Sequence, residues 1–247
     1  DGGSTDGTMD LVRSYPHLKW VSEKDKGHYD AMNKGVRMAA GEVICILNSD
    51  DCFTPGILNK VGRAFAEHPE WDAVFGNFAF VDSQGKLIYA RDEIPYNYNV
   101  LRYTGILYVN HQALFVRRSV HDRIGFYSDD KYVNCCDYDF ILRLGRMGCR
   151  VGHLKTRVVH YRYHDHGQSA DMRVARNMQR EAAIIRIANG VPGGIAGRVL
   201  KFIYRVKRQL WKLVYNGKID LVPGTVKLRS HMREKTRFTS NSDAQNL

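Results

Sequence analysis

The sequence predicts an α/β fold in which helices flank a mostly parallel central sheet. Its 247 residues are 44% hydrophobic, which is enough for one large core and excludes a disordered or fibrous chain. Residues 42–47 (EVICIL) form a continuous apolar run between Gly41 and Asn48, as expected for a strand that is covered on both faces. Strand and helix patterns alternate around this run, and such alternation is typical of parallel sheets.

The N-terminal segment opens on a glycine-rich turn, DGGSTDGT, over residues 1–8. Turns of this kind usually leave the end of a buried strand, so we expect the sequence to be N-terminally truncated, with the first strand missing. A short apolar run predicts a strand over residues 18–21, and helical spacing predicts a helix over residues 29–40.

A helix and a hairpin are predicted next. Thr54 followed by Pro55 indicates an N-capped helix with proline in its first turn, which ends near Pro69. Residues 73–81 alternate as a strand, and the turn sequence DSQG leads into a second strand over residues 86–89. Both elements extend the α/β pattern.

The alternation continues through the second half of the chain. Residues 113–116 are predicted to form a strand, residues 137–147 a helix and residues 150–154 another strand, with residues 158–163 as a further strand candidate. Residues 172–189 have the spacing of a helix. No internal repeat interrupts this order.

Most of the net charge of +11 lies near the C-terminus, because the residues from Arg198 onward hold 12 Lys/Arg against 3 Asp/Glu. Residues 198–214 place apolar side chains at helical spacing with lysines and arginines between them. This pattern predicts a basic amphipathic helix, which either lies on an anionic membrane surface or packs on the body with a solvated face. The last dozen residues are rich in polar side chains, and we expect them to be disordered.

The cellular location is predicted from what the chain lacks. Its five cysteines include no CxxC pair, so neither a disulfide framework nor a zinc ribbon is indicated. The sequence has neither an uncharged apolar run long enough for a membrane span nor the pattern of a signal peptide. We therefore expect a cytoplasmic protein, which is peripheral on the inner face of the cell membrane if the basic helix binds there.

Two adjacent carboxylates follow the central strand, in the sequence Asn48-Ser49-Asp50-Asp51. In open α/β folds ligands bind at the carboxyl ends of the strands. Neighbouring carboxylates repel each other, and a hard divalent cation such as Mg²⁺ or Mn²⁺ relieves that repulsion while sharing oxygen ligands with phosphates. The alternative is that the two acids merely cap the helix that follows.

Five segments together resemble the family 2 glycosyltransferases of the GT-A fold. They are DGGSTDGT (1–8), SEKDKGHYDAMNKG (22–35), GEVICILNSDD (41–51), NHQALFVRR (110–118) and DYDFILRLGRMG (137–148). The resemblance implies a GT-A catalytic domain over residues 1–170, and the helical spacing and charge of the remaining residues predict a helical, basic extension over residues 171–247. It also implies inverting transfer of a hexose or N-acetylhexosamine from a nucleotide-diphosphate sugar, with UDP favoured. The acceptor would be a glycan or a lipid-linked sugar in cell-surface polysaccharide synthesis.

The resemblance also implies roles for individual residues. The donor's nucleotide or sugar would contact Asp1, Asp25, Lys26, Gly27, Asp30 and Asn33. Asp50 would bind the ribose or the metal ion, and Asp51 the metal ion. His111 and Gln112 would face the acceptor or the sugar, and His164, in a Tyr-Arg-x-His ending, would complete the metal or diphosphate site. Simpler alternatives are helix capping for Asp30 and Asn33, and a structural role for a lone histidine.

An inverting transferase also needs a base that takes the proton of the acceptor hydroxyl. The family's base is the aspartate of an acidic pair, which corresponds to Asp137, although Cys136 stands here in place of the family's glutamate. Asp137 opens a predicted helix, whose dipole favours an ionised carboxylate. Asp139 is the competing assignment, and both residues could instead be ordinary helix-start acids.

Two other function classes remain open on the sequence alone. The basic tail could bind nucleic acid, although the body is nearly neutral and contains no recognised nucleic-acid module. A sugar-nucleotide pyrophosphorylase would also use an α/β sheet and a metal-bound diphosphate, but its glycine-rich basic loop is absent from the sequence. A transferase is expected to release the nucleoside diphosphate, whereas a pyrophosphorylase exchanges pyrophosphate.

Overall fold

The computed structural model describes residues 1–163 and 172–219. Within these residues the strands form one mixed sheet in the order β1-β5-β3-β6-β2, and β4 pairs with the same edge of β3 as β5 does. The strands are β1 (Val43–Cys45), β2 (Cys52–Phe53), β3 (Ala73–Val81), β4 (Leu87–Arg91), β5 (Leu114–Arg117) and β6 (Val151–Arg162). The α/β class predicted from the sequence is confirmed.

The prediction of a mostly parallel sheet is wrong for the described strands. β1, β3 and β6 run in the same direction, as the alternation of strands and helices predicts. However, β5 lies antiparallel between β1 and β3, and β2 and β4 run antiparallel to β6 and β3. The reason is local for β4, which follows β3 through a tight hairpin, and such a connection can join only antiparallel strands.

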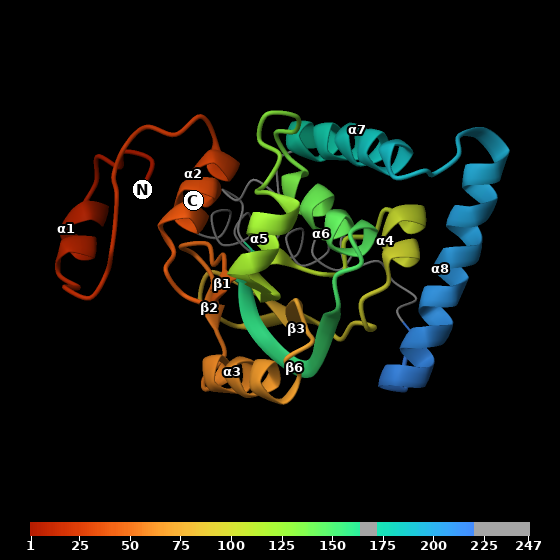
Figure 1. Ribbon diagram of the computed structural model, residues 1–247, viewed down its shortest axis with the longest axis horizontal. Coiled ribbons are helices and arrows are strands. Elements are labelled where there is room, and N and C mark those ends of the chain that lie inside the picture. Colours follow the sequence, from red (N-terminus) through yellow and green to blue (C-terminus); the bar gives the residue numbers. More distant parts are fainter. Residues whose placement is uncertain (164–171, 220–247) are drawn as a thin grey trace, which may run out of the picture.

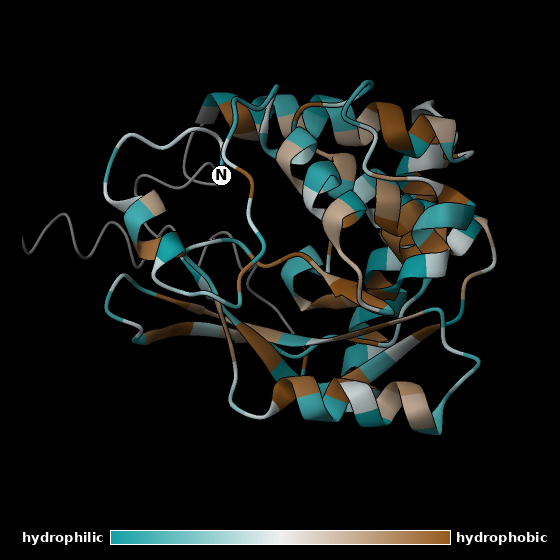
Figure 2. Cartoon of the chain, turned by 60° about the vertical axis from the view of Figure 1, so that its left-hand side comes forward, coloured by the Kyte–Doolittle hydropathy of each residue, from teal (hydrophilic) through white to brown (hydrophobic). Residues whose placement is uncertain are grey.

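Helices cover both faces of the sheet, with α3 on one face and α2, α5, α6 and α4 on the other (Figure 1). The helices are α1 (Thr8–Arg13), α2 (His28–Met38), α3 (Ile57–Glu67), α4 (Tyr98–Thr104), α5 (Arg118–Ile124), α6 (Cys136–Arg146), α7 (Met172–Ala188) and α8 (Gly194–Asn216), with a 3₁₀ turn, η1 (His111–Ala113). Apolar and polar residues alternate along α3 because only one of its faces meets the sheet (Figure 2).

Strand β3 supplies side chains to two separate cores, because successive residues of a strand point to opposite faces. Ala73 and Phe75 belong to the larger core beneath α2, α4 and α6. Val74 and Phe78 belong to the smaller core against α3. Because both of its faces are buried, β3 is the centre of the fold. It fixes the positions of the strands that pair with it on either side.

Several predicted boundaries differ from the structure. Helix α3 begins at Ile57 instead of Thr54, because the Thr54 hydroxyl donates to the carbonyl of Arg157 on β6 at 2.7 Å and ties this segment to the sheet. The strand predicted over residues 18–21 does not form. The Leu18 N–H donates to the Tyr15 carbonyl in a local turn at 3.1 Å, and the Val21 carbonyl accepts the Asp1 amine at 2.9 Å, so these residues make isolated contacts instead of a ladder.

The strands predicted over residues 150–154 and 158–163 are one strand, β6, whose register against β3 shifts between Gly76 and Phe78. The other predicted helices and strands are present, with ends that move by a few residues.

The C-terminal helices pack against the body of the protein. The Glu181 carboxylate on α7 accepts hydrogen bonds from three successive backbone N–H groups at residues 133–135, and Ile185 is fully buried in the larger core. Helix α8 packs along α4. Within the described residues, no helix is both long and apolar enough to span a bilayer. The division at residue 170 stays a prediction, and the predicted disordered end lies outside the described residues.

Candidate active site

Asp51 lies buried between the end of β1 and the start of β2, with 8% of its surface exposed. Strand β2 pairs with β6, which brings Arg162 beside this turn. The backbone N–H of Arg162 donates to Asp51 Oδ1 at 2.8 Å, and the side-chain Nε of Arg162 donates to the Asp50 carbonyl at 2.9 Å. From the other side, the Gln112 side-chain amide donates to Asp51 Oδ2 at 3.0 Å.

The electrostatics of this turn favour a cation. The pKa of Asp51 is raised to about 6, because burial and the neighbouring charge of Asp50 together outweigh the hydrogen bonds from Arg162 and Gln112, which lower it. Both hydrogen bonds described for its carboxylate come from uncharged donors. The buried Gln112 Oε1 has no hydrogen-bond partner within the described part of the chain. Two carboxylates and a nearby amide oxygen are a donor set that suits Mg²⁺ or Mn²⁺.

The described residues supply only part of a coordination shell here. No group of three or more His, Cys, Asp or Glu residues that could hold a metal ion occurs in residues 1–163 and 172–219. The third predicted ligand, His164, lies outside these residues. A cation at Asp50 and Asp51 would therefore have room for oxygen ligands from a bound diphosphate.

Asp137 lies in the first turn of α6 and contacts η1 through His111. Its Oδ1 accepts hydrogen bonds from the Tyr29 hydroxyl at 2.9 Å and from the Tyr138 backbone N–H at 2.8 Å. Its Oδ2 lies 3.4 Å from His111 Nδ1, and His111 Nε2 is buried with no hydrogen-bond partner in the described structure. One oxygen of Asp137 is therefore fixed, while the other faces a single imidazole.

The surroundings of Asp137 keep it ionised. Burial alone would raise its pKa, but the hydrogen bond and charge of His111, followed by the Tyr29 hydroxyl and the Tyr138 N–H, outweigh burial and hold the pKa below its usual value. Asp139 differs, because its Oδ2 accepts from Ser128 Oγ at 2.9 Å and pairs with Arg143 Nε at 2.8 Å. Its charge is already neutralised by that cation.

The predicted donor-side residues lie at the start of α2. Lys34 Nζ pairs with Asp25 at 2.7 Å and lies 3.4 Å from Asp30. The carboxylate of Asp30 also accepts the Lys26 backbone N–H at 3.0 Å, which lowers its pKa, and Gly27 is the N-cap residue. The Asp30 side chain therefore accepts the N–H of the residue before the N-cap, while Gly27 itself occupies the N-cap position.

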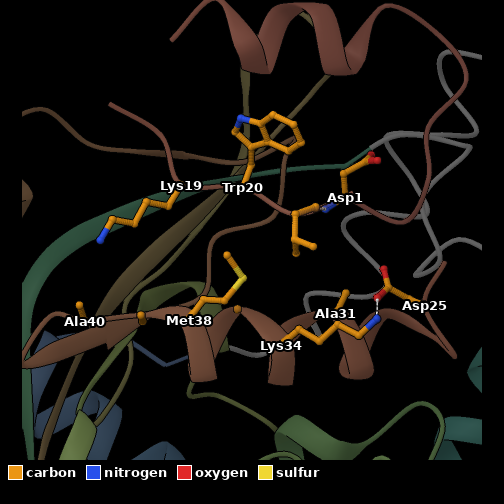
Figure 3. Close-up of a pocket in the computed structure, with 11 residues that line it drawn as sticks. Asp1, Lys19, Trp20, Asp25, Ala31, Lys34, Met38 and Ala40 are labelled. Atoms are coloured by element: carbon orange, nitrogen blue, oxygen red, sulfur yellow. Dashed lines mark hydrogen bonds and ion pairs between the residues drawn. The ribbon is translucent and has the colours of Figure 1, made fainter. Parts of the chain in front are cut away.

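Asp1 and Asp25 line a cavity of about 370 Å³ between residues 19–21 and α2 (Figure 3). The Asp1 carboxylate is held inside its own turn by the N–H groups of Gly3 and Ser4, both at 3.0 Å, and by Ser22 Oγ. Trp20 and Lys34 face the same cavity from opposite walls.

Asn33 has a different environment, with 1% of its surface exposed. Its side-chain NH₂ donates to the Tyr127 carbonyl and to the Asp129 carboxylate, and its side-chain oxygen accepts the Tyr127 N–H. These contacts fix the loop after α5 against α2, so we leave Asn33 out of the proposed donor site.

The structure thus joins four of the predicted residues, Asp51, Gln112, His111 and Asp137, in one chain of contacts. Sequence reasoning missed Tyr29 and Arg162 as members of this group. Both lie within segments that carry the family resemblance, Tyr29 in SEKDKGHYDAMNKG and Arg162 in the Tyr-Arg-x-His ending. The predictions based on the resemblance named neighbouring residues in these segments instead, such as Asp30 and His164.

Comparison with known proteins adds independent evidence. The family model described as glycosyl transferase family 2 matches residues 1–125. A PGL/p-HBAD biosynthesis glycosyltransferase of Mycobacterium bovis is 30% identical over 151 residues, which cover 58% of this chain and 55% of the relative. YwdF of Bacillus subtilis, an uncharacterized glycosyltransferase, is 31% identical over 168 residues, which cover 62% of this chain and 58% of YwdF. The chain therefore spans little more than half the length of these relatives.

Two groups of solved structures share the fold. Staphylococcus aureus TarS in complex with UDP-GlcNAc superposes with a TM-score of 0.59 at 15% identity, over 87% of this chain and 62% of TarS. The mannosyltransferase PcManGT of Pyrobaculum calidifontis, in complex with GDP-Man and Mn²⁺, superposes with a TM-score of 0.53 at 21% identity, over 85% of this chain and 59% of that enzyme.

Proposed function

The chain belongs to glycosyltransferase family 2 and has the GT-A fold, and from that premise we propose that it is an inverting, metal-dependent transferase of a hexose or N-acetylhexosamine. The donor is a nucleotide-diphosphate sugar, for which we favour UDP, and the acceptor is a glycan or a lipid-linked sugar of cell-surface polysaccharide synthesis. TarS binds UDP-GlcNAc, and PcManGT binds GDP-Man, which supports a nucleotide-sugar donor. The five free cysteines support a cytoplasmic location.

One observation carries this proposal. His111 and Gln112 are consecutive residues of η1, yet Gln112 contacts Asp51 and His111 contacts Asp137. Direct displacement at a sugar carbon requires the leaving diphosphate on one side and the attacking hydroxyl on the other. The turn η1 contacts both a carboxylate suited to the first role and a carboxylate suited to the second.

On the donor side, Asp50 and Asp51 would hold Mg²⁺ or Mn²⁺ together with the diphosphate. Such an ion neutralises the negative charge that grows on the departing nucleoside diphosphate. The desolvated, uncompensated carboxylate of Asp51 supports this assignment. Asp1 and Asp25, which line the cavity beside α2, are the proposed contacts of the nucleotide.

On the acceptor side, Asp137 is the proposed base. The acceptor oxygen forms its bond to the anomeric carbon as the bond from that carbon to the phosphate oxygen breaks. The hydroxyl proton passes to Asp137 Oδ2, and the nucleoside diphosphate leaves with the bonding electrons. Tyr29 and the Tyr138 N–H hold Oδ1 and so orient the carboxylate. Asp139 is unsuited to this role because Arg143 pairs with it.

The test is product release by the purified protein. We would measure nucleoside diphosphate formation with Mn²⁺ across several UDP-sugars and GDP-mannose, for the wild type and for Asp51→Asn, Asp137→Asn and Asp139→Asn. Loss of the metal site or of the base is expected to lower turnover by about 10²–10⁴-fold. Asp139→Asn is the matched control, since it removes a carboxylate from the same helix turn. It should lose stability and keep most of its turnover.

Three results would overturn the proposal. Turnover that is unchanged in both Asp51→Asn and Asp137→Asn would remove its mechanism. Exchange of labelled pyrophosphate into the nucleotide sugar, without transfer to an acceptor, would identify a pyrophosphorylase instead. Salt-dependent retention on DNA combined with no binding of any nucleotide sugar would identify a nucleic-acid-binding protein.

A further inference from the structure

Helix α8 turns an apolar face outward, away from the protein body. The exposed side chains on this face are 43–80% accessible and recur at spacings of three and four residues. We call the following set the α8 apolar face: Ile195, Val199, Phe202, Ile203, Val206, Leu210, Leu213 and Val214. At about 100° per residue these positions share one side of the helix. Such a patch is unusual on a surface that meets only water.

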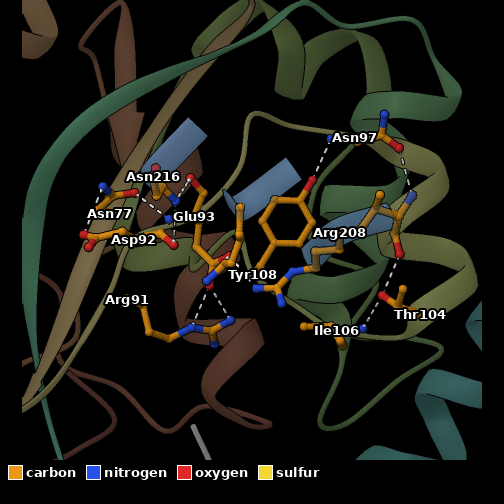
Figure 4. A network of polar contacts seen from close by, with 12 residues as sticks. Asn77, Arg91, Asp92, Glu93, Asn97, Thr104, Ile106, Tyr108, Arg208 and Asn216 are labelled. Carbon is orange, nitrogen blue, oxygen red and sulfur yellow. Dashed lines mark hydrogen bonds and ion pairs between the residues drawn. The ribbon is translucent and has the colours of Figure 1, made fainter. Parts of the chain in front are cut away.

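The opposite side of α8 is fixed to the body by buried charges (Figure 4). Arg208 and Lys212 are only 4% and 2% exposed. Both pair with Glu93, which is fully buried, at 2.5 and 3.4 Å, and Arg91 pairs with the same carboxylate at 2.5 Å. Burial would raise the pKa of Glu93, but these three cations outweigh it and keep the pKa low.

Two aromatic residues, Tyr204 and Trp211, and one amide, Asn216, complete this attachment. The two rings pack against the larger core, and the Asn216 amide donates to the Asp92 carbonyl at 3.1 Å. Rotation of α8 to bury its apolar face would expose these rings and separate a buried ion cluster, which is strongly unfavourable. The outward direction of the apolar face is therefore built into the fold.

This arrangement corrects the sequence-based picture of α8. The lysines and arginines of residues 198–214 were expected to fill the helix surface, but Arg208 and Lys212 point into the body. The exposed cations Arg198, Arg205 and Lys207 remain, and they flank the apolar face on its two sides. Helix α8 contains no acidic residue.

We propose that the α8 apolar face inserts into the interface of an anionic lipid bilayer, with the helix axis parallel to the membrane and the flanking cations among the headgroups. Charge favours lipid over the other candidate occupants. A second copy of the chain would place its own three exposed cations close to those of the first copy, and these like charges repel. Residues 220–247 carry five Lys/Arg against three Asp/Glu, so they also lack the negative charge that the flanks require. Anionic headgroups supply it.

This inference deepens the proposed function and rests on it for one point, the lipid-linked acceptor. A membrane that holds α8 would present such an acceptor to the domain on which α8 packs. Binding of the face to lipid, by contrast, is independent of the sugar donor and of the metal ion. The two ideas can therefore fail separately.

The experiment is cosedimentation of the full chain with vesicles of phosphatidylcholine, and of phosphatidylcholine mixed with phosphatidylglycerol. We expect binding to the mixed vesicles, reduced more than tenfold by the double variant Phe202→Ser/Leu210→Ser. The matched control is Leu58→Ser/Leu87→Ser, which changes two equally exposed leucines outside α8 and should bind like the wild type.

A second double variant tests how much the exposed cations contribute to vesicle binding. Arg205→Glu/Lys207→Glu should lose the preference for anionic vesicles, because each cation near such a surface contributes about fivefold to binding. Hydrogen exchange of α8 should slow when mixed vesicles are added to the wild type and stay unchanged in Phe202→Ser/Leu210→Ser.

Three results would overturn the proposal. One is a wild-type dimer, by light scattering, that Phe202→Ser/Leu210→Ser converts to a monomer, since the face would then bind a second copy. Another is a monomer that binds neither kind of vesicle, as expected if residues 220–247 cover the face. The third is equal binding by Phe202→Ser/Leu210→Ser and the wild type. Sugar transfer to a soluble acceptor should be the same in the wild type and in Phe202→Ser/Leu210→Ser. Absence of transfer in both proteins would count against the proposed function and not against membrane binding.

Discussion

The substitution Asp51→Asn should make the metal-free protein more stable, although it removes a residue of the proposed active site. In the fold, burial and the charge of Asp50 raise the pKa of Asp51 from 3.8 to about 6. The unfolded chain therefore ionises this carboxyl at a lower pH than the folded chain does. Stability is lost as the pH rises from about 4 to about 6, and the loss stays constant above that range.

The size of the effect follows from the two pKa values. A carboxyl whose pKa rises from 3.8 to about 6 destabilises the fold by roughly 3 kcal/mol once it is ionised in both states. An asparagine carries no charge, and its oxygen can accept the Arg162 N–H, while its NH₂ can donate to Gln112 Oε1 once the Gln112 amide flips to exchange its NH₂ and oxygen. For a chain of this length the gain corresponds to a rise in Tm of roughly 5–10 °C.

Thermal unfolding followed by circular dichroism, in the presence of a chelator, measures this difference. The variant should be more stable than the wild type at roughly pH 8, and the gap should shrink toward pH 4. Addition of Mn²⁺ should then raise the Tm of the wild type and leave that of Asp51→Asn unchanged. A variant that is less stable than the wild type at the higher pH, or that gains as much from Mn²⁺, would refute the reasoning.

Three further predictions rest on other parts of the structure. The substitution His111→Ala removes the largest of the contacts that lower the pKa of Asp137, so the acidic limb of the kcat–pH profile should move to higher pH; an unmoved limb would contradict the contact. Glu93→Gln leaves its buried cations without a counter-charge and should cost about 3–5 kcal/mol in denaturant unfolding. Gly152→Ala places a methyl group 2.2 Å from the ring of Trp71 and should destabilise the fold by about 1–3 kcal/mol, measured in the same way.

Local patterns in the sequence predicted most of the elements but not how they pair. The run at residues 42–47 and the alternation at residues 73–81 carry their own signals, because a strand's burial appears directly in its side chains. The direction of β5 depends on where its loop returns to the sheet, and no residue within β5 reports that. Thr54 is a second case in which a distant partner decides the local structure. Its hydroxyl donates to a carbonyl on β6 instead of capping the helix that follows it in sequence.

The candidate site was predictable where one segment carries the chemistry. Asp51 follows a buried strand, so its place at the sheet edge could be expected from the sequence alone. The contact between His111 and Asp137 spans 26 residues, and that between Gln112 and Asp51 spans 61, so neither follows from spacing. Helix α8 is similar. Its amphipathic pattern was visible, but its orientation depends on Glu93, which lies far away in the sequence.

The peptide link between His111 and Gln112 has a practical consequence for redesign of the enzyme. Asn110 clamps this turn, because its side chain accepts the Gln112 N–H at 2.9 Å and its carbonyl accepts the Ala113 N–H. In the proposed mechanism, a library that inserts, deletes or loosens residues here would alter leaving-group activation and proton removal in a single step. Variation aimed at new sugar donors should therefore target the cavity wall beside α2 and leave residues 110–113 as they are.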